Sequence, residues 1–255
     1  MALNLVTIPC LKDNYAYLLH DAASGDTALV DAPEAAPILD ALAARGWTLG
    51  QIFITHHHSD HIDGVAAVVA ATGAQVLGAK ADAPRLPPLD RALAEGDVVT
   101  VGGEPGLVLD VSGHTIGHIA LHFAGSGYAF TADSLMAGGC GRLFEGTPEV
   151  MFASLGKLAA LPGETLICSG HEYTEANLRF AATIEPENPA LTARIARVAA
   201  ARAEGRATVP SRLSGEMATN PFLRAGQPQV KAAVGMPDAA DVAVFAELRA
   251  RKNRF

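Results

Sequence analysis

Thr55-His56-His57-His58-Ser59-Asp60-His61 is the stretch of sequence that decides the fold. It directly follows the apolar run 51–54, which belongs to a predicted β-strand over residues 49–55. A strand that ends in a loop fixes the backbone while side chains project from the sheet edge. His56 and His58 can turn their rings to one side, and Asp60 and His61 can serve a neighbouring point. Two divalent ions need about seven or eight protein donors, and this segment supplies four of them.

Three further ligand-type side chains stand just past other predicted strands. His114 follows the predicted strand 107–111, Asp133 follows 128–131, and His171 follows 165–168. Imidazole and carboxylate groups are donors that zinc and similar metals use in proteins. A lone histidine is most often a packed or surface residue. Four strand ends that each deliver such groups favour one shared metal site.

Composition limits the classes of protein that this chain can represent. Its 255 residues are 49% hydrophobic and 18% charged, which is typical of a globular protein with a sizeable core. It has no run of 18 or more apolar residues, so we expect no membrane span. The formal net charge of −8 argues against nucleic-acid binding. Three widely spaced cysteines and an N-terminus without a signal-peptide pattern indicate reduced thiols in the cytoplasm.

The predicted secondary structure changes character near residue 173. Before it, strands are predicted at 3–8, 15–20, 27–31, 49–55, 75–79, 98–101, 107–111, 119–123, 128–131 and 165–168, with helices at 34–45, 64–72 and 148–160. After it, the pattern predicts helices at 175–184, 189–204, 227–234 and 238–252, and no strand. This order predicts an α+β core domain over residues 1–173 and a helical companion domain over residues 174–255.

The histidine-rich segment and its downstream partners resemble the metallo-β-lactamase superfamily, whose signature is an H-x-H-x-D-H loop with later His, Asp and His ligands. The resemblance covers roughly residues 1–173 and implies an αββα sandwich with metal ions at one sheet edge. It implies that one ion is held by His56, His58 and His114, the second by Asp60, His61 and His171, and that Asp133 bridges both. His57 falls at the variable position, where we expect it to point away. His118 either orients a ligand or simply packs.

Four other segments resemble the hydroxyacylglutathione hydrolases, also called glyoxalase II. Residues 138–147, GGCGRLFEGT, are similar to the family's G-C-G-[RK]-x-[FY]-E-G-T element, and residues 171–174, HEYT, to its G-H-E-Y-T element. The tail segments NPFLR at 220–224 and LRARKNRF at 248–255 are similar to its N-P-F-x-R and R-x-x-K-[DN]-x-F elements. The resemblance implies that glutathione is bound by Arg142, Phe144, Tyr173, Arg249 and Lys252. Phe144 lacks the hydroxyl of the tyrosine that the family often has there.

The activity that this resemblance implies is hydrolysis of the thioester S-lactoylglutathione to glutathione and D-lactate, a step of methylglyoxal degradation. Two divalent ions would activate water and polarise the thioester carbonyl, and Asp60 would orient the resulting hydroxide. Zinc is the expected metal, although iron and manganese accept the same donors. We expect a cytoplasmic monomer whose partner is this small molecule, with no nucleic acid and no membrane.

Three alternatives remain at the level of sequence. A glutathione persulfide dioxygenase uses one iron on this fold, but its glycine-rich loop ends in T-D-F, where this chain has Leu143-Phe144-Glu145. A nucleic-acid-processing enzyme of the superfamily would need a basic surface, which an acidic chain does not predict. A non-catalytic binding module would keep the fold without turnover.

Overall fold

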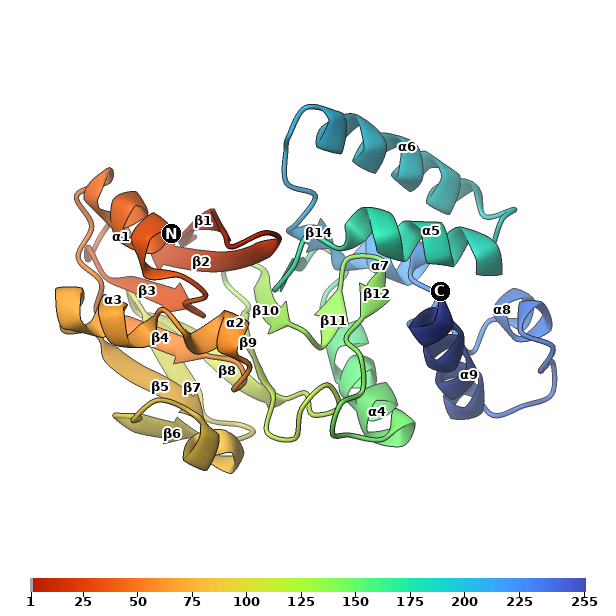
Figure 1. Ribbon diagram of the computed structural model, residues 1–255, viewed down its shortest axis with the longest axis horizontal. Coiled ribbons are helices and arrows are strands. Elements are labelled where there is room, and N and C mark those ends of the chain that lie inside the picture. Colours follow the sequence, from red (N-terminus) through yellow and green to blue (C-terminus); the bar gives the residue numbers. More distant parts are fainter. Residues whose placement is uncertain (1) are drawn as a thin grey trace. The chain divides into compact units, whose positions relative to one another are not determined.

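The computed structural model of the chain describes residues 2–255 (Figure 1). The chain folds into two units. Unit 1 contains the chain up to Asp110 together with Ile116–Thr131, and unit 2 contains Val111–Thr115 and Ala132–Phe255. Within residues 2–255, no helix is long and apolar enough to cross a membrane. The predicted boundary near residue 173 concerns folding domains and stays a prediction.

Unit 1 contains a six-stranded sheet in the order β1-β2-β3-β4-β5-β6. Its strands are β1 (Asn4–Cys10), β2 (Asn14–His20), β3 (Thr27–Val30), β4 (Gln51–Ile54), β5 (Gln75–Ala79) and β6 (Arg91–Leu93). The first three are antiparallel neighbours, and β3 to β6 are parallel. Parallel neighbours need crossover connections, and helices α1 (Ala35–Ala43) and α3 (Val65–Thr72) provide two of them. Ile38 and Val68 of these helices pack into the same apolar cluster as Ile52 of β4.

A second set of strands in unit 1 is antiparallel throughout. It contains β7 (Val98–Val101), β8 (Glu104–Asp110), β9 (Ile119–Phe123) and β10 (Tyr128–Ala132), in the order β10-β9-β8-β7. Tyr17 of β2 meets Phe130 of β10 edge to face, with 5.5 Å between ring centroids. The two sheets therefore face each other across a shared apolar layer, as the predicted sandwich requires.

Unit 2 is mostly helical. Its helices are α4 (Pro148–Ala159), α5 (Thr174–Ile184), α6 (Pro189–Ala203), α7 (Leu213–Thr219), α8 (Pro228–Ala233) and α9 (Asp241–Arg254) (Figure 1). Helix α6 begins where sequence chemistry indicates it: Asn188 accepts hydrogen bonds from two backbone amides, and Pro189 occupies the first turn. Short strands β11 (Leu135–Met136) and β12 (Gly139–Cys140) form a hairpin directly after Asp133. Strand β13 (Leu166–Ser169) leads to His171.

Two predictions about secondary structure are wrong. The tail contains a strand after residue 173, β14 (Ser211–Arg212), which pairs with Leu166 and Ile167 of β13. Two residues are too few to show the alternation that reveals a strand in sequence. The predicted loop after β4 instead contains a four-residue helix, α2 (Ser59–Ile62). The predicted strands 75–79, 98–101 and 119–123 are confirmed at both ends.

A buried carboxylate holds the first residue of the glycine-rich segment 138–147 in unit 2. Glu216 of α7 is fully buried. Its Oε2 accepts hydrogen bonds from the amide of Gly138 at 2.7 Å and from Asn220 Nδ2 at 3.2 Å. Its Oε1 pairs with the buried guanidinium of Arg194 and accepts from Ser211 Oγ at 2.6 Å. One side chain therefore joins α6, α7, β14 and the β11–β12 hairpin.

Replacing this carboxylate should destabilise the protein strongly. Glu216→Ala leaves Arg194 buried without its counter-charge, so we expect the free energy of unfolding to fall by roughly 3–5 kcal/mol. Glu164→Ala is the matched control, because the Glu164–Arg212 pair has side chains that are 80% and 61% exposed, and exposed pairs contribute little. Urea unfolding followed by circular dichroism measures both. Equal losses in the two variants would contradict the role given to Glu216.

Candidate metal centre

Unit 1 gathers the four ligand-type side chains that follow β4. Helix α2 begins directly after His58, which places Asp60 and His61 in its single turn. The ring of His56 lies 4.7 Å from that of His58 and 4.2 Å from that of His61, centroid to centroid. His56 and His61 are fully buried. Asn14 Nδ2 donates to Asp60 Oδ2 at 3.0 Å and holds that carboxylate in place.

A buried carboxylate beneath this group determines which ring nitrogens carry protons. Asp31 Oδ2 accepts from the Thr55 hydroxyl at 2.8 Å and lies 2.7 Å from His61 Nδ1. A hydroxyl has one proton, and that of Thr55 is donated to Asp31. The Thr55 oxygen can therefore only accept from His56 Nδ1, at 3.0 Å. Protons on Nδ1 of His56 and His61 leave the Nε2 lone pairs for a metal. His56 Nε2 lies 3.1 Å from His58 Nδ1, so two donor atoms converge.

Sequence reasoning missed Asp31, although the signal was present. Asp31 directly follows β3, as Asp133 follows the strand before it, and it has a positive φ of 57°. A non-glycine residue in this region is uncommon and indicates a conformation held by its surroundings. Here the amide of Thr55 donates to Asp31 Oδ1 at 2.8 Å, a contact that adds to the bonds on Oδ2. The strained backbone therefore aims a carboxylate at the histidine-rich segment.

The two remaining histidines of this region have other partners. His57 Nδ1 lies 2.9 Å from Oδ2 of the buried Asp82, in the 3₁₀ helix Lys80–Arg85. That His57 is not a ligand stays a prediction. Arg85 donates to the other oxygen of Asp82 at 2.7 Å. His118 is fully buried and stacks on His56, with 4.6 Å between ring centroids. His118 therefore supports the ring of a candidate ligand.

Unit 2 gathers the other three predicted ligands. Asp133 Oδ2 lies 3.4 Å from His114 Nε2 and 3.3 Å from His171 Nε2. A hydrogen bond from the backbone amide of Gly170 to the carbonyl of Ala132, at 3.0 Å, connects the end of β13 to the end of β10. Asp133 and His171, the next residues along each segment, therefore lie side by side. His114 Nδ1 donates to the carbonyl of Arg142 at 2.8 Å, so its Nε2 presents a lone pair.

The residues predicted to bind glutathione all lie in unit 2. Phe144 is 60% exposed and its ring lies 5.3 Å from that of His114, with the Arg142 guanidinium 5.9 Å from the Phe144 centroid. Tyr173 is partly exposed and stacks on His171, with 4.6 Å between ring centroids. Aromatic side chains therefore flank two candidate ligands.

The two residues of α9 that are predicted to bind glutathione, Arg249 and Lys252, are less exposed than Phe144. Arg249 is buried, and its Nη1 donates to the carbonyl of Cys140 at 2.8 Å. Lys252 Nζ donates to the carbonyl of Ala176 at 3.0 Å. Burial, followed by repulsion from Arg249 and Arg179, lowers the pKa of Lys252 to about 8.

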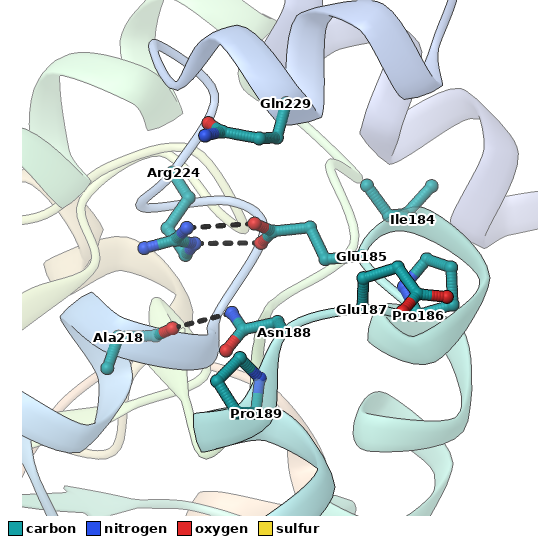
Figure 2. A pocket seen from close by; sticks show the side chains of 9 residues that line it. All are labelled: Ile184, Glu185, Pro186, Glu187, Asn188, Pro189, Ala218, Arg224 and Gln229. Atoms are coloured by element: carbon teal, nitrogen blue, oxygen red, sulfur yellow. Dashed lines mark hydrogen bonds and ion pairs between the residues drawn. The ribbon is translucent and has the colours of Figure 1, made fainter.

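A separate pocket of about 530 Å³ lies beside α5, α6 and α8 of unit 2 and contains none of the predicted site residues (Figure 2). Figure 2 shows the Glu185 carboxylate paired with the Arg224 guanidinium, with contacts of 2.7 and 2.8 Å. Asn188 Nδ2 donates to the carbonyl of Ala218 at 2.9 Å. Glu185 and Arg224 neutralise each other, and the pocket is not assigned a part in the chemistry.

The donor chemistry of the two clusters fits metal ions. Together they contain five histidines and two aspartates: His56, His58, Asp60, His61, His114, Asp133 and His171. Histidine and aspartate clusters of this kind could hold a metal ion, because neutral imidazole and carboxylate are preferred ligands of zinc and related metals. The bonds on Nδ1 of His56, His61 and His114 orient these rings in the way that metal sites require.

Comparison with known proteins agrees with this chemistry. The family model of the metallo-beta-lactamase superfamily matches residues 13–171, and a model described as the hydroxyacylglutathione hydrolase C-terminus matches residues 172–255. A solved B3 metallo-beta-lactamase, BLEG-1, is 22% identical, with a TM-score of 0.66 over 86% of this chain and 99% of that one. The chain therefore has the metallo-β-lactamase fold and belongs to that superfamily.

The relatives define the family more narrowly. A protein of Cereibacter sphaeroides named hydroxyacylglutathione hydrolase is 69% identical over 255 residues, which is 100% of both chains. A protein solved in a di-iron-bound form is 29% identical, with a TM-score of 0.58 over 66% of this chain and 91% of that one. Within the superfamily, this chain belongs to the hydroxyacylglutathione hydrolases.

The backbone beside the unit 2 cluster has no space for a side chain at residue 141. A Cβ on Gly141 would lie 1.9 Å from the carbonyl oxygen of Asp133 and 2.9 Å from His114 Nδ1. We expect Gly141→Ala to lower the free energy of unfolding by about 1–3 kcal/mol, because overpacking forces backbone shifts. Gly156→Ala is the control. Its Cβ would meet nothing within 4 Å on α4, so it should stabilise by up to about 1 kcal/mol. Urea unfolding measures both, and a neutral Gly141→Ala would contradict the packing described.

Proposed function

We propose that this chain hydrolyses the thioester of S-lactoylglutathione to glutathione and D-lactate, the reaction of the family to which it belongs. The observation that carries the proposal is the grouping of imidazole nitrogens around the Asp133 carboxylate, with four more ligand-type side chains after β4. Water becomes a nucleophile at neutral pH when divalent ions bind it. A thiolate leaves readily, so the reaction needs no strong general acid from the protein.

The proposed metal centre combines the clusters of both units. One ion would be held by His56, His58 and His114, the second by Asp60, His61 and His171, and Asp133 would contact both. The donor types support two ions, and a relative that is 29% identical was solved in a di-iron-bound form. We propose zinc, with iron and manganese as metals that accept the same ligands. Such ions, when bound, lower the pKa of water and polarise a carbonyl.

The chain's own residues would carry the remaining steps. Asp60, held by Asn14, would orient the attacking water and take its proton. The water oxygen forms a bond to the thioester carbon, the carbon–sulfur bond breaks, and the sulfur leaves as the glutathione thiolate. Because Asp60 sits in the single turn of α2 next to His61, its carboxylate is aimed by the same turn that presents a ligand. This makes Asp60 the proposed catalytic residue.

Glutathione would be bound by side chains of unit 2. Phe144 and Tyr173 flank the rings of His114 and His171, and Arg142 lies over Phe144. Glutathione carries two carboxylates, and an acidic protein needs local cations to bind them. Arg249 and Lys252 of α9 are the proposed cations. Residues 174–255 would then form a substrate-binding helical domain.

The single-iron dioxygenase alternative is not favoured. Hydroxyacylglutathione hydrolases from several bacteria match this chain over its full length, at 69% and 68% identity for two of them. We further propose that the protein works in the cytoplasm as a monomer on a small molecule, without nucleic acid or membrane.

Removing the shared carboxylate should abolish metal binding and activity. We expect Asp133→Ala and His58→Ala to lose metal, as measured by elemental analysis, and nearly all hydrolysis of S-lactoylglutathione. Asp133→Ala would remove a ligand from both ions, and His58→Ala would remove a ligand from one ion of the pair. Asp238→Ala is the control, since Asp238 is an exposed aspartate of the same unit, and it should leave both unchanged. If purified protein with its metal does not cleave this thioester, the proposed reaction is wrong.

The low pKa of Lys252 predicts a pH-dependent KM. Lys252 is charged below its pKa of about 8. As the pH increases through 8, the lysine loses the positive charge that would bind a carboxylate of glutathione, so KM should rise. Lys252→Met should raise KM at pH 7 and remove this dependence, with kcat little changed. Lys157→Met, on the exposed side of α4, is the control.

The same shift predicts a stability effect with a defined sign. The unfolded chain, with a lysine pKa near 10.5, binds more protons than the folded chain between pH 8 and 10.5. The contribution of Lys252 to the free energy of unfolding should therefore become more favourable as the pH rises through this window. Lys252→Met should not show this rise. An unchanged KM profile in Lys252→Met would contradict its assignment to glutathione.

A further inference from the structure

Residues 138–142, here called the support loop, lie between helix α9 and two of the proposed metal ligands. On one side the loop contacts Asp133 and His114. The amide of Gly141 donates to the carbonyl of Ser134 at 3.1 Å, and the carbonyl of Arg142 accepts from His114 Nδ1 at 2.8 Å. The absent side chain of Gly141 allows its backbone to approach the carbonyl of Asp133 closely. The position of this short segment therefore affects the His114 ring and the backbone that carries Asp133.

On its other side, the support loop is held by Arg249. Its Nη1 lies 2.8 Å from the carbonyl oxygen of Cys140 and 3.4 Å from that of Gly141. The guanidinium is buried, lies 5.2 Å from the ring centroid of Phe222, and donates from Nε to Asn253 Oδ1 at 3.1 Å. A planar group fixed on several sides can orient the carbonyls that it contacts.

These contacts form a continuous chain from α9 to the imidazole of His114. Peptide units are planar, so carbonyls held at Cys140 and Gly141 fix the two peptide planes that precede Arg142. Only the φ and ψ angles of Arg142 then remain to set the direction of its own carbonyl. That carbonyl keeps the proton of His114 on Nδ1 and the lone pair on Nε2. Mutation of partners that orient a ligand in this way typically lowers metal affinity by about 10–100-fold.

We propose that Arg249 is a positioning residue for His114 and Asp133, acting through the support loop, in addition to any contact with substrate. The inference rests on the proposed function, because it takes these two residues to be metal ligands. The two roles are compatible: Nη1 and Nε serve the protein, and Nη2 still has two N–H groups for a carboxylate. Lys252, three residues later, donates to Ala176 of α5 instead of the loop.

The proposal predicts that Arg249 and Lys252 variants differ in kind. Arg249→Met should weaken binding of the more weakly held ion by about 10–100-fold, the range seen when groups that orient ligands are removed. Lys252→Met should keep the wild-type metal affinity and change KM alone. Competition between each full-length variant and a chromophoric chelator, with Zn²⁺ as the probe, measures both affinities. Arg249→Lys, which keeps one donor, should recover part of the loss.

A second readout needs no metal. In the metal-free protein, ¹⁵N chemical shifts of the histidine rings report which nitrogen of His114 carries the proton. Wild type and Lys252→Met should show the Nδ1–H form of His114, and Arg249→Met should show a mixture of both forms. Asn253→Ala, which only loosens the guanidinium at Nε, should give a smaller change in the same direction. This variant keeps the buried cation and so keeps the test valid if Arg249→Met folds poorly.

Two results would overturn the proposal. One is an Arg249→Met protein that binds both ions as wild type does and differs in KM only, which would make Arg249 purely a substrate ligand. The other is an unchanged His114 tautomer in both Arg249→Met and Asn253→Ala. Failure of the proposed function is distinguishable, because wild-type protein would then bind no zinc or cleave no thioester, whatever the variants do.

Discussion

A neutral imidazole can offer a metal ion a lone pair on one nitrogen only if its proton is held on the other, and this constraint organises both clusters. In unit 1, Asp31 accepts the Nδ1 proton of His61 directly, and the Thr55 hydroxyl, which donates to Asp31, accepts the Nδ1 proton of His56. In unit 2, the carbonyl of Arg142 does the same for His114. Each case uses an acceptor that faces Nδ1 and leaves Nε2 directed toward the other donors. Packing and hydrogen bonds elsewhere in the fold keep these acceptors in place.

The supports differ in chemistry between the two units. Asp31 is buried on the sheet of unit 1 and keeps a positive φ, so its position depends on the packed strands β3 and β4. The carbonyl of Arg142 belongs to a glycine-rich segment that directly follows strand β12 of the short β11–β12 hairpin. That segment is held by side chains of the tail, among them Glu216, Asn220 and Arg249. The helical tail therefore contributes to the proposed metal centre as well as to the proposed substrate site.

Much of this arrangement could be predicted from sequence, because the relevant signals are local. The spacing of His56, His58, Asp60 and His61 after an apolar strand requires no knowledge of tertiary contacts, and the strand ends before Asp133 and His171 show the same pattern. Asp31 stands directly after a strand, as these ligands do, but the partners that the supporting residues contact could not be predicted in this way. Asp31 is separated from His61 by 30 positions and Arg249 from Cys140 by 109, and no periodicity reveals such pairs. Strand β14 was missed because two residues show no alternation.

The central proposal is that the clusters of the two units would serve one pair of ions. Crystallography of the metal-loaded protein, with data collected on both sides of the zinc absorption edge, tests it most directly. The account predicts two anomalous peaks, each within bonding distance of residues from both clusters, and Asp133 in contact with both ions. Peaks that touch residues of one cluster alone, or a single peak at full zinc loading, would contradict it.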